Sequence, residues 1–315
     1  MSQPANVKPS AIVFGSINID LVARSPQLPI PGKTLQGNKF FTAPGGKGAN
    51  QAVALARLGI ATHMIGRVGE DSFGEQLISS LKAAGVRTEC IFVDETVSSG
   101  VALISVDDAG ENQITIVAGA NGCIDDTDLE CLHSLLASAS ALLMQFEIPM
   151  PSILLAAQAA KQNGVKVILD PAPATTIPAE LYPLVDIITP NQTEIEQLGG
   201  FGVSNIESAT AAARILLQRG VGCAIVKLGA QGAVCVALEE TFFVPAFPVT
   251  TVDTVAAGDA FNGGLAAALA EGLPLQQAVV WGAGAGALAA TKLGAQSSMP
   301  TRDALIAFLQ ARGAI

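Results

Sequence analysis

One acid stands at the mouth of an apolar segment in DTVAAGDAFNGG (residues 253–264). Asp259 follows the small residues Ala256, Ala257 and Gly258 and precedes a long run rich in alanine and glycine. The first amides of a helix have no intrahelical partner and carry the positive end of its dipole, so this segment suits an approaching anion. Asp259 is then either a helix cap or a group that does chemistry on that anion.

A second glycine-rich turn, APGGKGANQA (43–52), also leads into a helical pattern and holds Lys47 and Asn50 near its start. The turn is either a tight strand-to-helix connection or a place where the backbone approaches a polar ligand. In the second case the Asn50 side chain supplies both an amide donor and an acceptor.

Polar side chains follow several apolar strand patterns. GSINID (15–20) ends one strand with Asn18 and Asp20 on the same side, where a carboxylate can accept two vicinal hydroxyls or simply cap a loop. Glu147 follows a second strand, and Asn191 with Glu194 follows a third. VKLGAQG (226–232) predicts a strand, a turn and another strand. Four such ends indicate one shared polar edge.

The chemical inventory excludes several mechanisms. The two histidines, His63 and His133, have no carboxylate or cysteine at ligand spacing, which argues against a Ser-His-Asp triad and a histidine zinc site. No Walker P-loop pattern occurs. GAGAGA (282–287) fits a dinucleotide-binding pattern formally, but no strand precedes it, so close helix packing is the favoured interpretation.

Composition indicates an acidic, cytoplasmic protein with a large core. Of its 315 residues half are hydrophobic, and the net charge is −10 with no basic cluster, which argues against nucleic-acid and membrane partners. The N-terminus lacks the apolar region of a signal peptide, and the uninterrupted apolar run 278–290 is too short for a membrane span. We expect the five scattered cysteines (90, 123, 131, 223 and 235) to be reduced thiols.

The elements that must position these residues alternate between strand and helix. Strands are predicted at 11–19, 63–69, 90–93, 141–146, 165–170, 186–190 and 223–229, and helices at 50–59, 73–85, 151–164 and 208–220. This order predicts an α/β fold with a mostly parallel central sheet and helices on both faces. Segments 22–46 and 98–121 break the rhythm as extended hairpins, the second turning at 108–110. They predict a small separate sheet that forms a lid.

Taken together, these segments resemble the ribokinase family of carbohydrate and nucleoside kinases over about residues 11 to 310. GGKGANQAVALARLG (45–59) and DTVAAGDAFNGG look like the two family signatures. GSINID, VSSGVALI (97–104), GANG (119–122), ALLMQFE (141–147), DIITPNQTE (186–194) and KLGAQG (227–232) follow the family pattern in order. The resemblance implies one ribokinase-like three-layer domain over 1–315, with lid strands inserted from about 18–44 and 98–121. It also implies a homodimer formed through the β lid.

The same resemblance implies transfer of a phosphoryl group from ATP to the 5-hydroxyl of D-ribose, giving D-ribose 5-phosphate and ADP. Asp259 would take the sugar proton, and the amides of Ala256, Ala257 and Gly258 would form an anion hole. The residues implied around the sugar, besides Asp259, are Asn18, Ile19, Asp20, Gly46, Lys47, Gly48, Ala49, Asn50 and Glu147. Those implied around the nucleotide are Asn191, Lys227, Leu228, Gly229, Ala230, Gln231, Gly232, Gly258 and Asp259.

Two ions are implied in the same way. Glu194, in the N-x-x-E pattern of 191–194, would act indirectly on Mg²⁺. Potassium would be held at Asp253, Val255, Ala289, Lys292, Gly294 and Ser298, mostly through backbone carbonyls. Two positions depart from the family pattern: Lys227 stands where a small hydroxyl residue is frequent, and Ala283 where a polar residue is frequent near the adenine.

Other functions stay open from sequence. A related kinase acting on another sugar (fructose-like) or on a nucleoside would need few changes to the sugar pocket. A sensor with this fold and no catalysis is disfavoured by the intact Gly258-Asp259 pair. A dehydrogenase built on GAGAGA is disfavoured because no strand leads into it.

Overall fold

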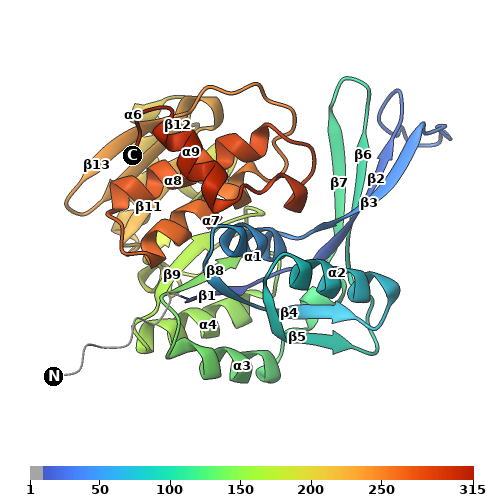
Figure 1. Ribbon diagram of the computed structural model, residues 1–315, viewed down its shortest axis with the longest axis horizontal. Helices are drawn as coiled ribbons and strands as arrows, with labels where there is room; N and C mark the ends of the chain where they lie inside the picture. The colour runs from blue at the N-terminus through green and yellow to red at the C-terminus, as the bar shows by residue number, and fades with distance from the viewer. Residues whose placement is uncertain (1–9) are drawn as a thin grey trace.

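A nine-stranded sheet forms the centre of the computed structural model, which describes residues 10–315 (Figure 1). Its strand order is β13-β12-β11-β10-β9-β8-β1-β4-β5. The strands that pair in parallel are β1 (Ser10–Phe14), β4 (Ala61–Gly69), β5 (Arg87–Asp94), β8 (Ala141–Gln145), β9 (Lys166–Asp170), β10 (Ile187–Ile188) and β11 (Cys223–Lys227). Only β12 (Gly232–Ala237) runs against its neighbours, β11 and β13 (Thr241–Pro245). The predicted mostly parallel α/β sheet is confirmed.

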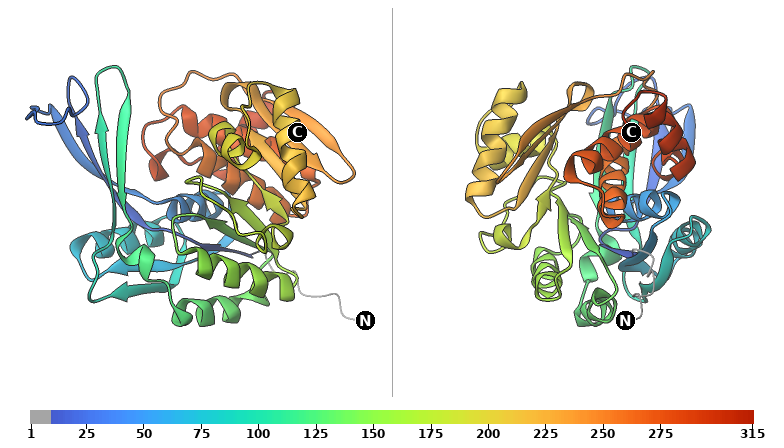
Figure 2. Two further views of the ribbon diagram at one scale, coloured as in Figure 1. Left: turned by 180° about the vertical axis from the view of Figure 1, so that it is seen from behind. Right: turned by 60° about the vertical axis from the view of Figure 1, so that its left-hand side comes forward.

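Helices cover both faces of this sheet (Figure 2). One layer holds α1 (Lys47–Arg57), α2 (Ser72–Ala83), α7 (Ala257–Ala270), α8 (Leu275–Ala290) and α9 (Arg302–Gln310). The other holds α3 (Asp126–Leu136), α4 (Met150–Gln162), α5 (Gln192–Gly199) and α6 (Ile206–Gln218). Strand β1 shows why two layers form, because Val13 packs into the first core and Phe14 into the second. Alternate side chains of a strand point to opposite faces, so an all-apolar strand needs cover on both sides.

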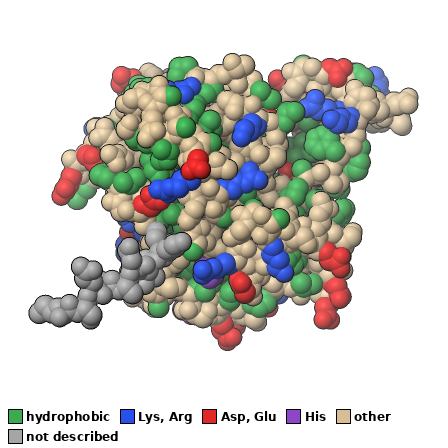
Figure 3. Space-filling model, in the orientation of Figure 1, with side chains coloured by type: hydrophobic (Ala, Val, Ile, Leu, Met, Phe, Trp, Pro, Cys, Tyr) green, Lys and Arg blue, Asp and Glu red, His purple; other side chains and the backbone are tan. Residues whose placement is uncertain are grey.

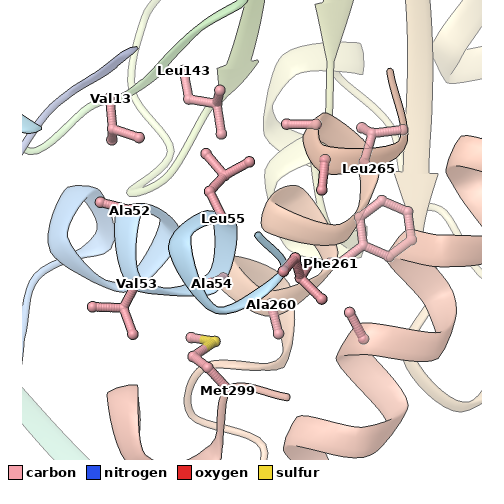
Figure 4. Close-up of a cluster of buried hydrophobic side chains, with 14 of the residues drawn as sticks. Val13, Ala52, Val53, Ala54, Leu55, Leu143, Ala260, Phe261, Leu265 and Met299 are labelled. Carbon is pink, nitrogen blue, oxygen red and sulfur yellow. The ribbon is translucent and has the colours of Figure 1, made fainter. Parts of the chain in front are cut away.

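Helix α1 packs against both the sheet and α7, which lies beside it in the same layer (Figure 4). Leu55 of α1 points toward Val13 and Leu143 of the sheet, while Ala54 lies beside α7. A Cβ added to Gly263 of α7 would collide with the Ala54 Cβ, so the two helices approach closely only because that residue is glycine. The packing brings the first turns of α1 and α7 together, and those turns carry Asn50 and Asp259.

A second, four-stranded sheet rises beside the helices (Figure 1). Its order is β3-β2-β6-β7, from β2 (Asn18–Arg24), β3 (Lys39–Gly45), β6 (Gly100–Val106) and β7 (Asn112–Val117). β2 with β3 and β6 with β7 are antiparallel pairs, and β2 joins β6 in parallel. Both predicted hairpins are confirmed, and the second turns at Gly110, whose φ of 86° suits glycine. Short 3₁₀ helices are η1 (Gly119–Cys123), η2 (Tyr182–Leu184), η3 (Gly229–Gln231) and η4 (Gln296–Ser298).

The interpretation of GAGAGA as helix packing is confirmed, because residues 282–287 lie inside α8. There Gly282 faces the ring of Phe261. The expectation of reduced cysteines is wrong for one pair: Cys90 of β5 and Cys131 of α3 form a disulfide, with their Cα atoms 6.1 Å apart. The sequence hides this pairing, because it depends on how α3 packs across the edge strand. Within residues 10–315, none of the helices has the length and apolarity needed to cross a membrane.

Candidate active site

Asp259 is the third residue of α7 and is 4 % exposed. Its carboxylate does not cap the helix: the cap position is Ala256, and no side chain bonds there. Instead both oxygens accept hydrogen bonds from α1. Asn50 Nδ2 donates to Asp259 Oδ2 at 2.9 Å, and Gln51 Nε2 donates to Oδ1 at 3.1 Å. The question raised by the sequence is therefore settled against a cap.

The charge on Asp259 is destabilised by its surroundings. Burial raises the pKa of this carboxyl to about 6, with Lys47 acting to lower it and the nearby Asp170 to raise it. A carboxylate with this pKa is mostly ionised at neutral pH, yet it is more basic than an ordinary aspartate. Those are the properties a general base needs.

Three polar side chains gather beside Asp259 at the foot of the small sheet. Asn18 is buried, and its Oδ1 accepts from Asn121 Nδ2 at 2.7 Å. Burial raises the pKa of Asp20 to about 7, helped by the negative charges of Glu147 and Asp259. Glu147 accepts from the Ser16 hydroxyl and, at 3.2 Å, from the Lys47 backbone N–H. The structure thus brings together the predicted sugar residues of three separate segments.

The glycines of the first signature permit this closeness. Gly45 pairs with Asn18 across β2 and β3, and a Cβ on Gly45 would collide with the carboxylate of Asp20, two residues further along β2. Gly46 has a φ of 87° and caps α1, and a Cβ there would lie 2.7 Å from the Asn18 backbone nitrogen. Only glycine allows that conformation and that approach without strain.

Lys47 is one of two lysines that line the cavity, with Lys227. Burial lowers the pKa of its ammonium, but the carboxylates of Asp259, Asp170, Glu147 and Glu194 outweigh burial, so the net effect is a raised pKa. Lys47 therefore stays charged among acids that would otherwise repel one another.

A cavity of about 620 Å³ opens on the other side of Asp259. The predicted residues that line it are Lys47, Asn191, Glu194, Lys227, Gly229, Ala230, Gly232, Val255, Ala257, Gly258 and Asp259. Asp170 and, from α8, Ala283, Gly286, Ala287 and Ala290 also line it. Asn18, Asp20, Asn50 and Glu147 are not among the lining residues. Asp259 and Lys47 line the cavity and also contact this second group of side chains, through Asn50 and Glu147.

The far wall of the cavity contains two short polar networks. Asn191 and Glu194 form a capping box at the start of α5: Asn191 N donates to Glu194 Oε2 at 2.7 Å, and Asn191 Nδ2 donates to Oε1 at 2.8 Å. Lys227 Nζ lies 3.0 Å from Asp170 Oδ1, and a Cβ on Gly258 would be 3.5 Å from the same Nζ. The Lys227 ammonium is therefore close to the start of α7.

Some residues predicted to bind the sugar or the nucleotide do not expose a group for doing so. The side chains of Ile19 and Ala49 are fully buried in the core, and Leu228 is 5 % exposed and does not line the cavity. The Ala257 N–H donates to the Thr254 carbonyl at 3.1 Å, so a turn bond already occupies that member of the expected anion hole. Gly48 is buried against the backbone of Ser16, and Gln231 belongs to η3 without lining the cavity.

The predicted potassium residues converge in part. The Asp253 carboxylate accepts from Gly294 N at 2.9 Å and from Val255 N at 3.1 Å. Lys292 N donates to the Ala289 carbonyl at 3.1 Å, and the Ser298 hydroxyl donates to Ala295 O. Across the described part of the chain, no three His, Cys, Asp or Glu side chains form a metal-binding group.

Sequence reasoning missed Gln51, Asp170, Asn121 and Ser16. Asp170 ends β9 as a polar residue after an apolar strand, the same signal that marked Glu147, and Gln51 follows Asn50 in the signature. The Asn121 side chain accepts a hydrogen bond from the backbone N–H of Ile17 at 2.8 Å and so fixes the connection between β1 and β2. Asp170 lines the cavity directly, whereas Gln51 contacts the site through Asp259 and Asn121 through Asn18. No single segment of the sequence reveals these contacts.

A family model described as pfkB family carbohydrate kinase matches residues 8–302. The chain belongs to the pfkB family of carbohydrate kinases. The fold described above is thus that of a pfkB carbohydrate kinase.

Relatives of this pfkB chain are similar along nearly their whole length. The chain is 42 % identical to ribokinase from Haemophilus influenzae over 298 residues, which cover 95 % of this chain and 97 % of the relative. It is 35 % identical to deoxyribokinase from Salmonella typhimurium, covering 92 % and 95 %. Among solved structures, Arabidopsis thaliana ribokinase complexed with ribose and ATP superposes with a TM-score of 0.90 at 34 % identity, covering 96 % and 99 %.

Proposed function

We propose that this protein transfers the terminal phosphoryl group of ATP to the 5-hydroxyl of D-ribose, giving D-ribose 5-phosphate and ADP. One observation carries the proposal: Asp259 lines a cavity large enough for a nucleotide and also contacts Asn50, a member of the predicted sugar-binding cluster. Relatives that act on ribose, including one solved with ribose and ATP, support the choice of sugar.

The sugar would bind beneath the small sheet. Asp20 and Glu147 accept hydroxyl hydrogens, while the Asn50 and Asn18 amides fix the ring's orientation. The 5-hydroxyl then approaches Asp259, which accepts its proton as the bond to phosphorus forms. Binding through several convergent groups matters here because positioning supplies much of the rate of phosphoryl transfer.

The phosphates would lie along the cavity toward the start of α7. The Gly258 N–H and the helix dipole face the transferred group, and Lys47 balances its charge from the sugar side. The Ala256–Gly258 anion hole requires the Ala257 N–H to leave or share its bond to the Thr254 carbonyl. Small residues are needed in this turn because larger side chains would hold the phosphate away.

Glu194 fits an indirect role toward Mg²⁺. Its carboxylate lines the cavity and is held by two Asn191 donors, so it can accept hydrogen bonds from ion-bound water without moving. Mg²⁺ would supply charge neutralisation on the nucleotide phosphates.

The residues around Asp253 fit a monovalent cation. Within residues 10–315, the Asp253 carboxylate accepts hydrogen bonds from the backbone N–H groups of Val255 and Gly294 and forms no salt bridge. A carboxylate that no cationic side chain neutralises offers oxygen ligands to a hard cation such as K⁺. The segment between Asp253 and Ala256 leads directly into the anion hole, so an ion there would order the turn that binds phosphate.

The small sheet is proposed to be both lid and dimer interface. Phe41, Ile114 and Ile116 share the face of the sheet that carries Asp20, and they are 38 %, 50 % and 47 % exposed. Figure 3 shows hydrophobic side chains gathered on this upright part of the molecule. A second copy of the sheet would cover this surface and keep water from the sugar. We place the reaction in the cytoplasm, where ATP is supplied.

The decisive experiment measures ADP release with D-ribose, 2-deoxy-D-ribose, fructose and adenosine, with and without potassium. The deoxy sugar is included because a deoxyribokinase is among the relatives. We expect D-ribose to give the highest kcat/KM and potassium to increase it. A better turnover of any other acceptor would replace D-ribose as the substrate, and no ADP release with the whole panel would refute the kinase assignment.

A further inference from the structure

A network of side-chain amides and acids reaches Asp259 from behind. Gln51 Nε2 donates both to Asp259 Oδ1 at 3.1 Å and to Asp170 Oδ2 at 3.0 Å. Gln145 Nε2 in turn donates to Gln51 Oε1 at 2.8 Å. The three residues come from α1, β9 and β8, and each is at most 3 % exposed.

We propose that Gln51 is a positioning residue for phosphoryl transfer, whose single amide group holds the Asp259 carboxylate in place and separates it from Asp170. The inference rests on the proposed function, since it concerns the base of that reaction. Gln51 does not touch the cavity, and it acts only through the acid it holds.

The geometry leaves Gln51 one orientation. An amide NH₂ has two hydrogens, and here each meets one carboxylate. The opposite orientation would point the Gln51 oxygen at two acids and its NH₂ at the donating group of Gln145. The bond from Gln145 therefore favours this orientation of Gln51, although the Gln145 Oε1 itself has no hydrogen-bond partner within residues 10–315. Burial of these side chains keeps water from replacing any of them.

The network also defines opposing electrostatic effects on Asp259. The groups that act on it are Lys47 at the start of α1, Asp170 at the end of β9 and Asp20 of β2, together with the Asn50 and Gln51 donors. A hydrogen bond from Gln51 favours the charged form and lowers the Asp259 pKa, whereas the negative charge of Asp170 raises it. Removing the Gln51 donor should therefore raise the pKa of Asp259, and removing the Asp170 charge should lower it.

A purely structural glutamine would behave differently. If Gln51 only fixed α1 to the sheet, its loss would reduce stability and lower activity equally at every pH. A positioning role makes a sharper prediction, because the acidic limb of the kcat profile reports the base in the substrate complex.

The test compares Gln51→Met, which keeps the volume and removes both donors, with Asp170→Asn, which keeps the acceptor and removes the charge. Gln158→Met is the control, a partly buried glutamine of α4 on the opposite face of the sheet. We expect Gln51→Met to lower kcat about 10- to 100-fold, the usual effect of losing a hydrogen bond to a charged group. KM for both substrates should change little.

The direction of the pH shift decides the proposal. The acidic limb of kcat should move to higher pH in Gln51→Met and to lower pH in Asp170→Asn, and should not move in Gln158→Met. An unchanged limb in Gln51→Met, or shifts of the same sign in both variants, would overturn the inference while leaving the kinase assignment intact. A wild-type protein inactive on the whole acceptor panel would instead refute the proposed function.

A second measurement covers a folding defect. Carboxylate ¹³C titration of the substrate-free protein reports the Asp259 pKa and needs no activity measurement. The variant Gln145→Met keeps Gln51 but removes the hydrogen bond that Gln145 donates to its oxygen. If Gln51→Met does not fold, the proposal stands only if Gln145→Met lowers kcat and raises the Asp259 pKa in that titration. If Gln145→Met leaves kcat or the Asp259 pKa unchanged, the proposal is overturned.

Discussion

The amide of Asn50 donates to the carboxylate of Asp259 at 2.9 Å across a sequence separation of 209 residues. Asn50 belongs to the first turn of α1 and Asp259 to the first turn of α7, and the two helices pack directly on each other. In the proposed reaction, Asn50 orients the acceptor sugar and Asp259 receives its proton, so this hydrogen bond fixes the two groups to each other. Neither can move without displacing the other.

Replacing Asp259 with asparagine should abolish most of the activity without unfolding the protein. We expect turnover to fall by about 10²–10⁴-fold, the usual effect of removing a general base. The melting temperature should change little, because two effects oppose each other. Removing a charge that burial disfavours stabilises the folded state, and losing the acceptor of one of the two hydrogen bonds from Asn50 and Gln51 destabilises it. Steady-state kinetics and thermal unfolding measure both.

The matched control is Asp303→Asn, in the exposed first turn of α9. It should leave turnover unchanged. Near-wild-type turnover in Asp259→Asn would contradict the catalytic assignment.

The pH profile should show an acidic limb in kcat near pH 6. The base must be ionised to accept a proton, so the rate is lost as pH falls through the raised pKa of Asp259, about 6. The kcat/KM for the sugar should begin to fall at higher pH, because burial raises the pKa of Asp20 to about 7 in the free protein. A kcat that stays constant down to pH 4 would exclude a buried carboxylate as the base.

Replacing Lys227 with threonine tests the departure from the family pattern. The ammonium lies against Asp170 in the cavity that we propose holds ATP, and its loss should raise KM for ATP about 10- to 100-fold, the usual effect of losing a hydrogen bond between charged groups. KM for the sugar should change much less. Lys161→Thr breaks an exposed Lys–Asp pair of similar length, 3.1 Å, and should change neither constant. Equal effects in the two variants would remove Lys227 from the nucleotide site.

The lid surface can be tested with Ile114→Asp. A charge on this exposed apolar face should dissociate a dimer and raise KM for the sugar, because the sheet would no longer be covered. Sedimentation velocity measures the first effect. Leu238→Asp is the control, since Leu238 is 91 % exposed between β12 and β13 and far from the lid in sequence and sheet order. A wild-type protein that sediments as a monomer would contradict the proposed interface.

Much of the fold and site was predictable from the sequence. Alternation of β-branched runs with helical patterns indicated the parallel sheet, and glycine turns marked the starts of α1 and α7. Glu147 and Asn191 were marked because a polar residue directly after an apolar strand is a local signal. Such features depend only on neighbours along the chain, so they can be recognised in the sequence alone. Asn18 and Asp20 were marked as the end of one strand predicted at 11–19, and that prediction is wrong: the segment is divided between β1 of the large sheet and β2 of the small one, and both residues belong to β2.

The tertiary structure decided what depends on packing between distant segments. It showed that Asp259 is held by Asn50 and Gln51 rather than capping its helix, and it introduced Asp170 as a neighbour that raises its pKa. It also joined Cys90 to Cys131. Hydrogen-bond partners, burial and charge proximity all vary with distances of a few ångströms. Those distances arise only when helices and strands far apart in sequence come into contact.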